Sequence, residues 1–246
     1  MAFLYLQESG LNEEQLRAFE RFREMLIHAN QTMNLTAITE PVEVEIKHFL
    51  DSLLIQKCGL WKKSIVSCNK KPRGLKVADV GAGAGFPGIP LRILYEEIRL
   101  DVFEATEKRV LFMRELAQDI GLDPLRIFHM RAEDAGRDPE FRAHYDWVLS
   151  RGVASMPALL EMCLPLVKTG GYFAAYKGPS GEKEAQEWKA AAAILGGMLV
   201  ETVQCELPEK QGERRIIIYQ KVAPTPKGYP RKAGIPTKQP LTSKPA

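Results

Sequence analysis

A glycine-rich segment beside an acidic residue carries the clearest chemical signal in this sequence. Val77 to Gly88 reads Val-Ala-Asp-Val-Gly-Ala-Gly-Ala-Gly-Phe-Pro-Gly, so Asp79 stands two residues before the first glycine. Small residues between a strand and a helix let a ligand approach the backbone closely, and the first turn of a helix offers free N–H groups. The segment predicts a small-molecule site built largely from backbone.

Two cofactors fit this segment. The glycines from Gly83 to Gly88 satisfy Gly-x-Gly-x-x-Gly, and Glu104 follows at the spacing of a dinucleotide fingerprint. Asp79 argues against NAD, because a carboxylate is unfavourable beside a pyrophosphate and suited to the ammonium of a methionine moiety. We therefore favour S-adenosylmethionine over NAD.

Three further positions fall at the ends of successive predicted strands. Glu104 can accept hydrogen bonds from ribose hydroxyls. Glu133 either helps to read an adenine edge or only caps the next short helix. Arg151 follows the fourth strand, at the mouth of the cleft that such a sheet forms. We expect these side chains to surround one ligand.

Motifs that this sequence lacks reduce the number of methyl-transfer reactions it can be expected to catalyse. Exocyclic amine methyltransferases present an Asn/Asp-Pro-Pro-aromatic segment after the fourth strand, where this chain has Ser150 to Val153. No cysteine stands where a pyrimidine-C5 nucleophile is needed, since Cys163 falls inside a helix expected over 156–166. An acceptor with an in-plane lone pair, such as a purine N7, remains, and its methylation needs positioning more than a base.

The elements that position these residues follow from hydrophobic periodicity. Helical spacing covers 11–31, with Asn12 as N-cap, and a second helix is expected over 41–56. From about 75 onward, short apolar runs alternate with helical patterns, which indicates βαβ units, and the last two strands form an antiparallel hairpin. The predicted strands are 76–80, 99–104, 126–130, 146–150, 172–176, 198–206 and 214–221.

The expected fold is therefore α/β: a doubly wound, mostly parallel, seven-stranded Rossmann-like methyltransferase sheet with an N-terminal helical addition and an extended basic tail. We divide the chain into a helical region (1–70), an S-adenosylmethionine-binding core (71–221) and a Pro-rich tail (222–246).

Composition excludes several classes of protein. The 246 residues carry a net charge of +3, lack a secretory signal and contain no uncharged apolar run long enough for a membrane span. The four cysteines and four histidines form no metal-binding spacing. We expect a cytoplasmic protein with reduced thiols, no metal and no obligate protein partner.

The tail is the most basic part of the chain. Six basic residues and no acidic residue lie between Lys221 and Ala246, separated by prolines that favour an extended chain. Tyr229, Ile235 and Leu241 are apolar anchors that a merely solubilising tail seldom carries. We expect the tail to pack near Arg214 and to bind RNA phosphates while leaving cofactor binding nearly unchanged.

Several segments together resemble one known family. They are Asp79 to Pro90, Ala132-Glu133, Ser150-Arg151, Tyr176-Lys177-Gly178, Asn34-Leu35-Thr36, His48 to Ser52 and Tyr229 to Leu241. Taken in chain order, over roughly residues 11–241, they resemble the RsmG family, also called GidB, of small-subunit rRNA methyltransferases. The resemblance implies methyl transfer to N7 of a guanine in the 530-loop of 16S rRNA, with rRNA, the small subunit or an assembly intermediate as the partner.

The resemblance also sharpens the site. With the residues argued above, the expected cofactor contacts are Asp79, Gly81, Gly83, Gly85, Phe86, Glu104, Ala105, Thr106, Ala132, Glu133 and Arg151. The expected RNA contacts are Lys108, Arg109, Arg151, Lys177, Arg214, Arg231 and Lys232. Arg151 and Lys177 are the expected catalytic residues, which position RNA without acting as a base. Asn34 with Thr36, and His48 with Asp51, are interpreted as structural.

Two other classes of protein stay open at this point. A NAD-dependent oxidoreductase needs a proton donor at the hydride site, and no His or Tyr at a strand end provides one. A non-catalytic RNA-binding protein would keep the basic tail but has no need for Asp79, the glycines and Glu104 together.

Overall fold

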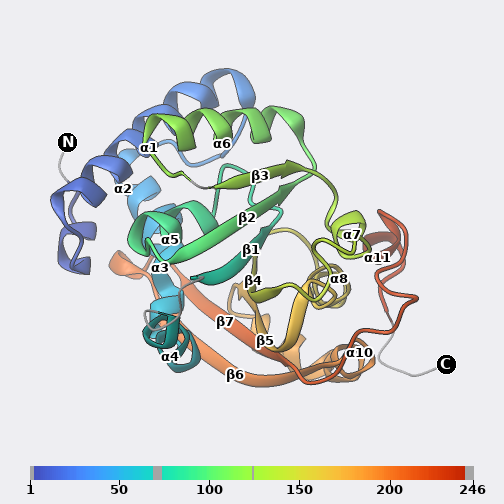
Figure 1. Ribbon diagram of the computed structural model, residues 1–246. Helices are drawn as coiled ribbons and strands as arrows, with labels where there is room; N and C mark the ends of the chain where they lie inside the picture. The colour runs from blue at the N-terminus through green and yellow to red at the C-terminus, as the bar shows by residue number, and fades with distance from the viewer. Residues whose placement is uncertain (1–2, 69–73, 124, 242–246) are drawn as a thin grey trace.

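One twisted seven-stranded sheet forms the centre of the molecule (Figure 1). The computed structural model describes residues 3–68, 74–123 and 125–241. The strands are β1 (Leu75–Val80), β2 (Ile98–Glu104), β3 (Arg126–His129), β4 (Tyr145–Arg151), β5 (Val167–Lys177), β6 (Gly197–Glu206) and β7 (Glu213–Lys221). Their order is β3-β2-β1-β4-β5-β7-β6. The first five are parallel, and β7 is antiparallel to both β5 and β6.

This sheet confirms the predicted fold class, including the antiparallel hairpin at its end. The main difference is β5, which starts at Val167 instead of 172. Gly170 and Gly171 interrupt the apolar pattern there, so periodicity alone places the start too late.

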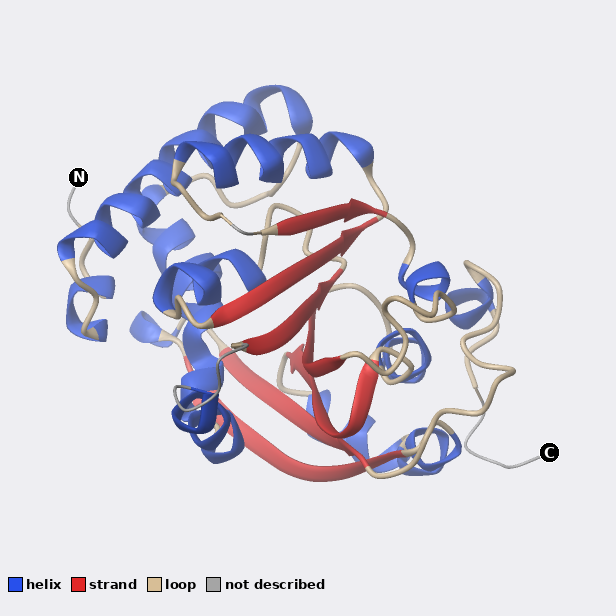
Figure 2. Cartoon of the chain, viewed as in Figure 1, coloured by secondary structure: helices blue, strands red, loops and turns tan. Residues whose placement is uncertain are grey.

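Helices cover both faces of the sheet (Figure 2). The α-helices are α1 (Glu13–Met33), α2 (Pro41–Val44), α3 (Asp51–Leu53), α4 (Gly59–Cys68), α5 (Gly88–Leu94), α6 (Glu107–Asp119), α7 (Ala132–Ala135), α8 (Met156–Cys163), α9 (Gly181–Glu187), α10 (Lys189–Ile194) and α11 (Ile235–Lys238). Short turns are η1 (Leu6–Ser9), η3 (Leu54–Lys57) and η4 (Pro208–Lys210), all 3-10, and η2 (Glu45–Leu50), which is π-helical. Asn12 caps α1 through a capping box with Gln15, as predicted.

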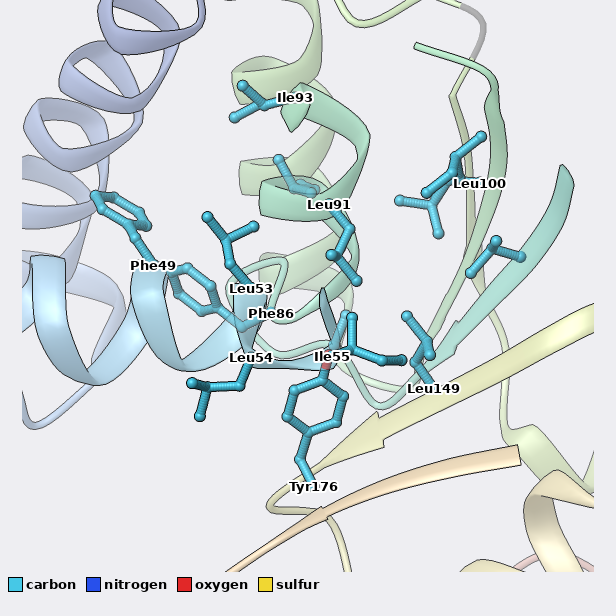
Figure 3. Packing of buried hydrophobic residues seen from close by; sticks show 14 of the residues in the cluster. Phe49, Leu53, Leu54, Ile55, Phe86, Leu91, Ile93, Leu100, Leu149 and Tyr176 are labelled. Atoms are coloured by element: carbon cyan, nitrogen blue, oxygen red, sulfur yellow. The ribbon is translucent and has the colours of Figure 1, made fainter. Parts of the chain in front are cut away.

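Alternation along the buried strands feeds two hydrophobic cores. Val77 and Leu149 pack into the core under α1 to α6, whereas Ala78 and Val148 pack into the core under α7 to α10. Figure 3 shows part of the first core, a single cluster that includes Phe49 from the N-terminal helices and Leu149 of the sheet. The N-terminal region therefore shares its core with the sheet.

The predicted helix over 41–56 is present but irregular. Helical turns run from Pro41 to Lys57, with a π-helical stretch over Glu45–Leu50. This wider turn leaves the carbonyls of Lys47 and His48 able to accept hydrogen bonds from Arg151 Nη1, each at 3.3 Å. The irregular stretch thus lies where the helical region meets the end of β4.

We expected the tail to pack near Arg214, and this expectation is wrong. Its described part leaves β7 at Lys221 and passes α8 and α7, where α11 lies (Figure 1). The reason is a buried acid on α8: Glu161 is fully buried and binds Arg231 Nη2 at 2.6 Å. Residues 242–246, which include Lys244, lie outside the described residues.

Candidate functional site

The carboxyl ends of the parallel strands enclose a cavity of about 400 Å³. Parallel strands end at one edge, so residues far apart in sequence meet there. The lining includes six predicted cofactor contacts, namely Gly81, Glu104, Ala105, Thr106, Ala132 and Glu133. It also includes residues that sequence reasoning missed: Val80, Phe103, Met130, Arg131, Gly152, Val153, Ala154, Met162, Gly234 and Thr237.

The glycine loop needs glycine for two different reasons. Gly81, Gly83 and Gly85 all have positive φ, at 69°, 62° and 103°. A Cβ on Gly81 would lie 2.5 Å from Val153 Cγ2, whereas a Cβ on Gly83 would meet nothing within 4 Å. Gly81 therefore serves both conformation and close packing at the cavity, while Gly83 serves conformation alone.

Asp79 lies fully buried under this loop. Its Oδ2 accepts a hydrogen bond from Gly88 N at 2.7 Å, and its Oδ1 is buried without a partner among the described residues. Burial raises the pKa of Asp79 to about 7, against the opposing effects of the Gly88 hydrogen bond and of Arg151. A buried carboxylate oxygen without a partner fits a cationic ligand.

Glu104 orders two stretches of backbone around the cavity. Its Oε2 accepts from Gly83 N at 3.0 Å and its Oε1 accepts from Thr106 N at 2.9 Å. A carboxylate offers about four lone-pair sites, so both oxygens retain capacity for ribose hydroxyls. Arg109 lines the same cavity, with Nη1 3.8 Å from Glu104 Oε1.

Arg151 lies in a chain of polar groups that joins β4 to the N-terminal helices. Asp51 bridges two cations: its Oδ2 accepts from Arg151 Nη1 at 2.9 Å and its Oδ1 from Arg214 Nε at 3.1 Å. Arg151 Nη2 lies 3.4 Å from His48 Nδ1, and Thr36 Oγ1 lies 2.8 Å from His48 Nε2. The predicted structural roles of Asp51 and His48 thus include holding Arg151, although Arg151 is not among the cavity lining residues.

His48 is held neutral in this chain. Burial and the neighbouring Arg151 lower its pKa to about 3. A neutral imidazole can accept from the Arg151 guanidinium at Nδ1 and donate to Thr36 at Nε2. Both ring nitrogens are then in use, so His48 has no free nitrogen for proton transfer.

The ring of Phe86 packs in the first hydrophobic core and does not line the cavity, where we expected a cofactor contact. Its ring is sandwiched between Phe22, at a centroid distance of 5.0 Å, and His48, at 4.6 Å. Figure 3 shows Phe86 among the residues of the first hydrophobic core. The sequence does not reveal this, because Phe22 and His48 come from helices far earlier in the chain. Asp79, Gly83 and Gly85 support the cavity without lining it.

Most of the predicted RNA-binding cations have internal partners. Lys177 Nζ binds Glu184 Oε2 at 2.8 Å and Ala154 O at 3.1 Å, and Lys108 Nζ donates to Met33 O at 2.6 Å. The sequence cannot show such pairs, since the partners lie on other elements. Arg231 is committed to Glu161, so it is not available as a free phosphate contact, whereas Lys232 is exposed and forms no ion pair within the described chain.

The residues present fit S-adenosylmethionine. Asp79 Oδ1 is buried behind the cavity wall at Val80 and Gly81, and as an unpartnered acceptor among the described residues it suits an ammonium that reaches it from the cavity. Glu104 can hold the ribose, and the cavity lies between the ends of β1, β2 and β4. Within the described residues, no group of three His, Cys, Asp or Glu side chains could hold a metal ion. In the same residues no helix has both the length and the apolar character that crossing a bilayer requires.

Comparison with known proteins agrees with this geometry. The family model for rRNA small subunit methyltransferase G (GidB) matches residues 15–216. The chain belongs to this family. A ribosomal RNA small subunit methyltransferase G from Staphylococcus saprophyticus is 42% identical over 234 residues, 95% of this chain and 93% of its own. One from a Geobacillus strain is 43% identical over 238 residues and covers 96% of both chains.

Membership of the GidB family confirms the prediction that this chain is a class I methyltransferase and that its cofactor is S-adenosylmethionine. The NAD-dependent alternative is therefore wrong. The fold agrees with a Listeria monocytogenes structure described as a class I S-adenosylmethionine-dependent methyltransferase, with a TM-score of 0.56 at 14% identity. That likeness covers 85% of this chain and 71% of the other.

Proposed function

We propose that this protein transfers the methyl group of S-adenosylmethionine to N7 of a guanine in the 530-loop of 16S rRNA. The family is named for small-subunit rRNA methylation, and the relatives carry that name over nearly the whole chain. The observation that carries the chemistry is at the end of β4, next to the cavity lining, where Arg151 and Arg214 both bind the Asp51 carboxylate.

The site supplies binding and orientation without a general base. S-adenosylmethionine, when bound, provides a methyl group on a sulfonium, and the N7 lone pair takes that methyl without first losing a proton. Among the described groups beside Arg151, His48 has both ring nitrogens in use and Asp51 is held between two cations. Neither is placed to remove a proton, which suits an acceptor that needs none.

Arg151, Arg214 and Lys177 position the RNA in this proposal. They lie at the adjacent ends of β4, β5 and β7, because Lys177 pairs with Arg215 and Arg151 with Tyr176. Arg151, Arg214 and Asp51 together have a net charge of +1, and 26% of the Arg214 side chain is exposed. A partly exposed, oriented guanidinium suits a phosphate of the RNA backbone.

Mapping of methylated nucleotides tests the target. Small-subunit RNA from cells that lack the gene is expected to lose one N7-methylguanine, and this modification should return with the parent gene but not with Glu104→Gln. Unchanged modification of 16S rRNA in the deletion strain would contradict the proposal.

Single-turnover kinetics at saturating cofactor test the mechanism. We expect no side-chain base with a pKa above about 6 in the pH profile of the rate. A rate that rises log-linearly with pH through neutrality, and that one His or carboxylate substitution abolishes while RNA affinity is intact, would show that a base is needed.

A further inference from the structure

The basic tail contributes two residues to the wall of the cofactor cavity. Gly234 and Thr237 line the cavity together with the ends of β2 and β4. The family model stops at residue 216, so this wall comes from chain outside the matched core. The Geobacillus relative covers 96% of this chain, which requires a match that continues beyond residue 216.

An ion pair between partly exposed Arg231 and a buried carboxylate holds the tail at this place. Arg231 binds Glu161 through Nη2 at 2.6 Å and Nε at 2.9 Å, and the Arg231 backbone N–H donates to the same carboxylate at 2.8 Å. Glu161 is completely buried on α8. A buried carboxylate needs this partner, because an unpaired buried charge is strongly unfavourable.

Contacts before Arg231 fix the approach of the tail. Arg142 Nη1 donates to Tyr229 O at 2.8 Å, and Arg137 Nε donates to Pro230 O at 2.9 Å. Pro230 packs so closely on Gly136 that a Cβ there would lie 2.9 Å from Pro230 Cγ. The tail is thus seated against the segment that follows α7 before it reaches the cavity.

Glu133 connects the tail to the cofactor residues. Its Oε1 accepts from Gly234 N at 2.8 Å, and no hydrogen bond is recorded to Oε2 within the described chain. Glu133 itself lines the cavity and is almost fully buried. One carboxylate oxygen therefore holds the tail while the other remains available to a ligand.

We propose that residues 229–238 form a wall of the S-adenosylmethionine site, and that tight binding of S-adenosylmethionine and of its product S-adenosylhomocysteine requires this wall to be docked. The inference rests on the cofactor site described above and replaces our expectation that the tail serves RNA alone. It does not depend on which nucleotide is methylated.

Calorimetry with S-adenosylhomocysteine in the absence of RNA tests this wall. Arg231→Ala should weaken binding about tenfold, since it removes charge-assisted hydrogen bonds that hold the tail. Lys227→Ala is the matched control, because it removes the same charge from an exposed tail residue that lies outside the cavity lining. It should bind like the parent.

A second pair of variants keeps the test valid if Arg231→Ala unfolds. Thr237 is exposed and lines the cavity, so Thr237→Arg should obstruct the site and weaken binding at least about tenfold without loss of the thermal transition. Gln239→Arg adds the same side chain two positions later, outside the lining, and should change little.

The outcomes separate the two proposals. A parent protein that binds no S-adenosylhomocysteine overturns the cofactor site and the wall together. If the parent binds S-adenosylhomocysteine, and Thr237→Arg and every other folded variant bind it equally well, the proposal of the wall alone is overturned. Loss of cofactor affinity in Thr237→Arg with Gln239→Arg unchanged supports the wall, whatever RNA position is modified.

Discussion

Asp79 is a carboxylate that the fold leaves half-satisfied. One oxygen has the Gly88 N–H as its partner and the other has none among the residues that the structure describes, in a place without contact to water. Such a group is costly unless a ligand completes it. Its raised pKa has the same origin, since burial without a paired cation favours the neutral acid.

Cofactor affinity should therefore depend on pH. Below about pH 7 Asp79 is neutral and has to lose a proton when the ammonium of S-adenosylhomocysteine binds, so affinity should fall by up to about tenfold per pH unit as pH drops from 7.5 toward 5.5. Calorimetry across this range measures the effect. Asp79→Asn should bind weakly and without this slope, whereas Asp134→Asn, which changes an exposed acid, should keep it. Equal slopes in all three proteins would disprove the assignment.

The glycine loop offers a comparison within one motif. Gly81→Ala and Gly83→Ala both place Cβ on a residue with positive φ, which costs about 1 kcal/mol, but only Gly81→Ala also meets Val153. Gly81→Ala should therefore lower the thermal midpoint more. Adding Val153→Ala should recover much of that difference, and a lack of recovery would mean that the contact with Val153 is not the cause.

At this scale, the sequence indicated which residues lie together where one short segment holds them, and their roles toward the cofactor stay predictions. Asp79 and Glu104 were found from their spacing to the glycines, and the structure brings both to the glycine loop. Phe86 was misplaced, and the partners of Arg151 were not foreseen. The contacts of Phe86 come from different helices, those of Arg151 join residues about a hundred positions apart, and one sequence carries no signal for such pairs.

At the scale of elements, one lysine joins the ends of two helices to the tail. Lys221 is buried and donates to Leu164 O and Leu195 O, each at 2.8 Å, and to Thr225 Oγ1. Those carbonyls end α8 and α10, where helices lack internal partners. Lys221 therefore holds the tail at the point where it leaves the sheet.

Lys221→Met should cost about 3 kcal/mol of unfolding free energy, because two buried helix-end carbonyls lose a charged donor and keep only the neutral donors Val167 N and Thr225 Oγ1. Urea denaturation measures the loss. Lys227→Met makes the same change on an exposed residue and should stay within about 0.5 kcal/mol of the parent. A Lys221→Met protein as stable as the parent would show that the charged donor adds nothing to those carbonyls beyond their neutral donors.

Elements with a regular period were predictable, and the tail was not. Alternation and turn residues located all seven strands, because each strand buries a face in one of two cores. The tail has no period, and its position depends on Glu161, a residue that looks like an ordinary helical acid in the sequence. Its contribution to the cavity was therefore missed.

At the scale of the whole molecule, the helical region and the sheet should unfold together. One hydrophobic cluster runs from Phe3 to Ile218, and the rings of Trp61 on α4 and Trp147 on β4 meet at 5.1 Å. Thermal midpoints from tryptophan fluorescence and from far-UV circular dichroism should coincide. A truncated protein that begins at residue 74 should show no cooperative thermal transition. If it unfolds at the same midpoint as the parent, the two regions are independent.

The direction of β7 sets a length for the tail. Because β7 is antiparallel to the other core strands, it ends at the edge of the sheet opposite the cavity, yet Gly234 has to reach Glu133. The residues from 222 to 233 can span at most about 40 Å, and the nine residues of β7 already cover about 30 Å. The return path therefore has little slack. Extra residues there can loop out into solvent, whereas a deletion of a few residues would separate Gly234 from Glu133. The length of the sheet along its strands therefore sets the minimum number of residues that must connect β7 to the cavity wall.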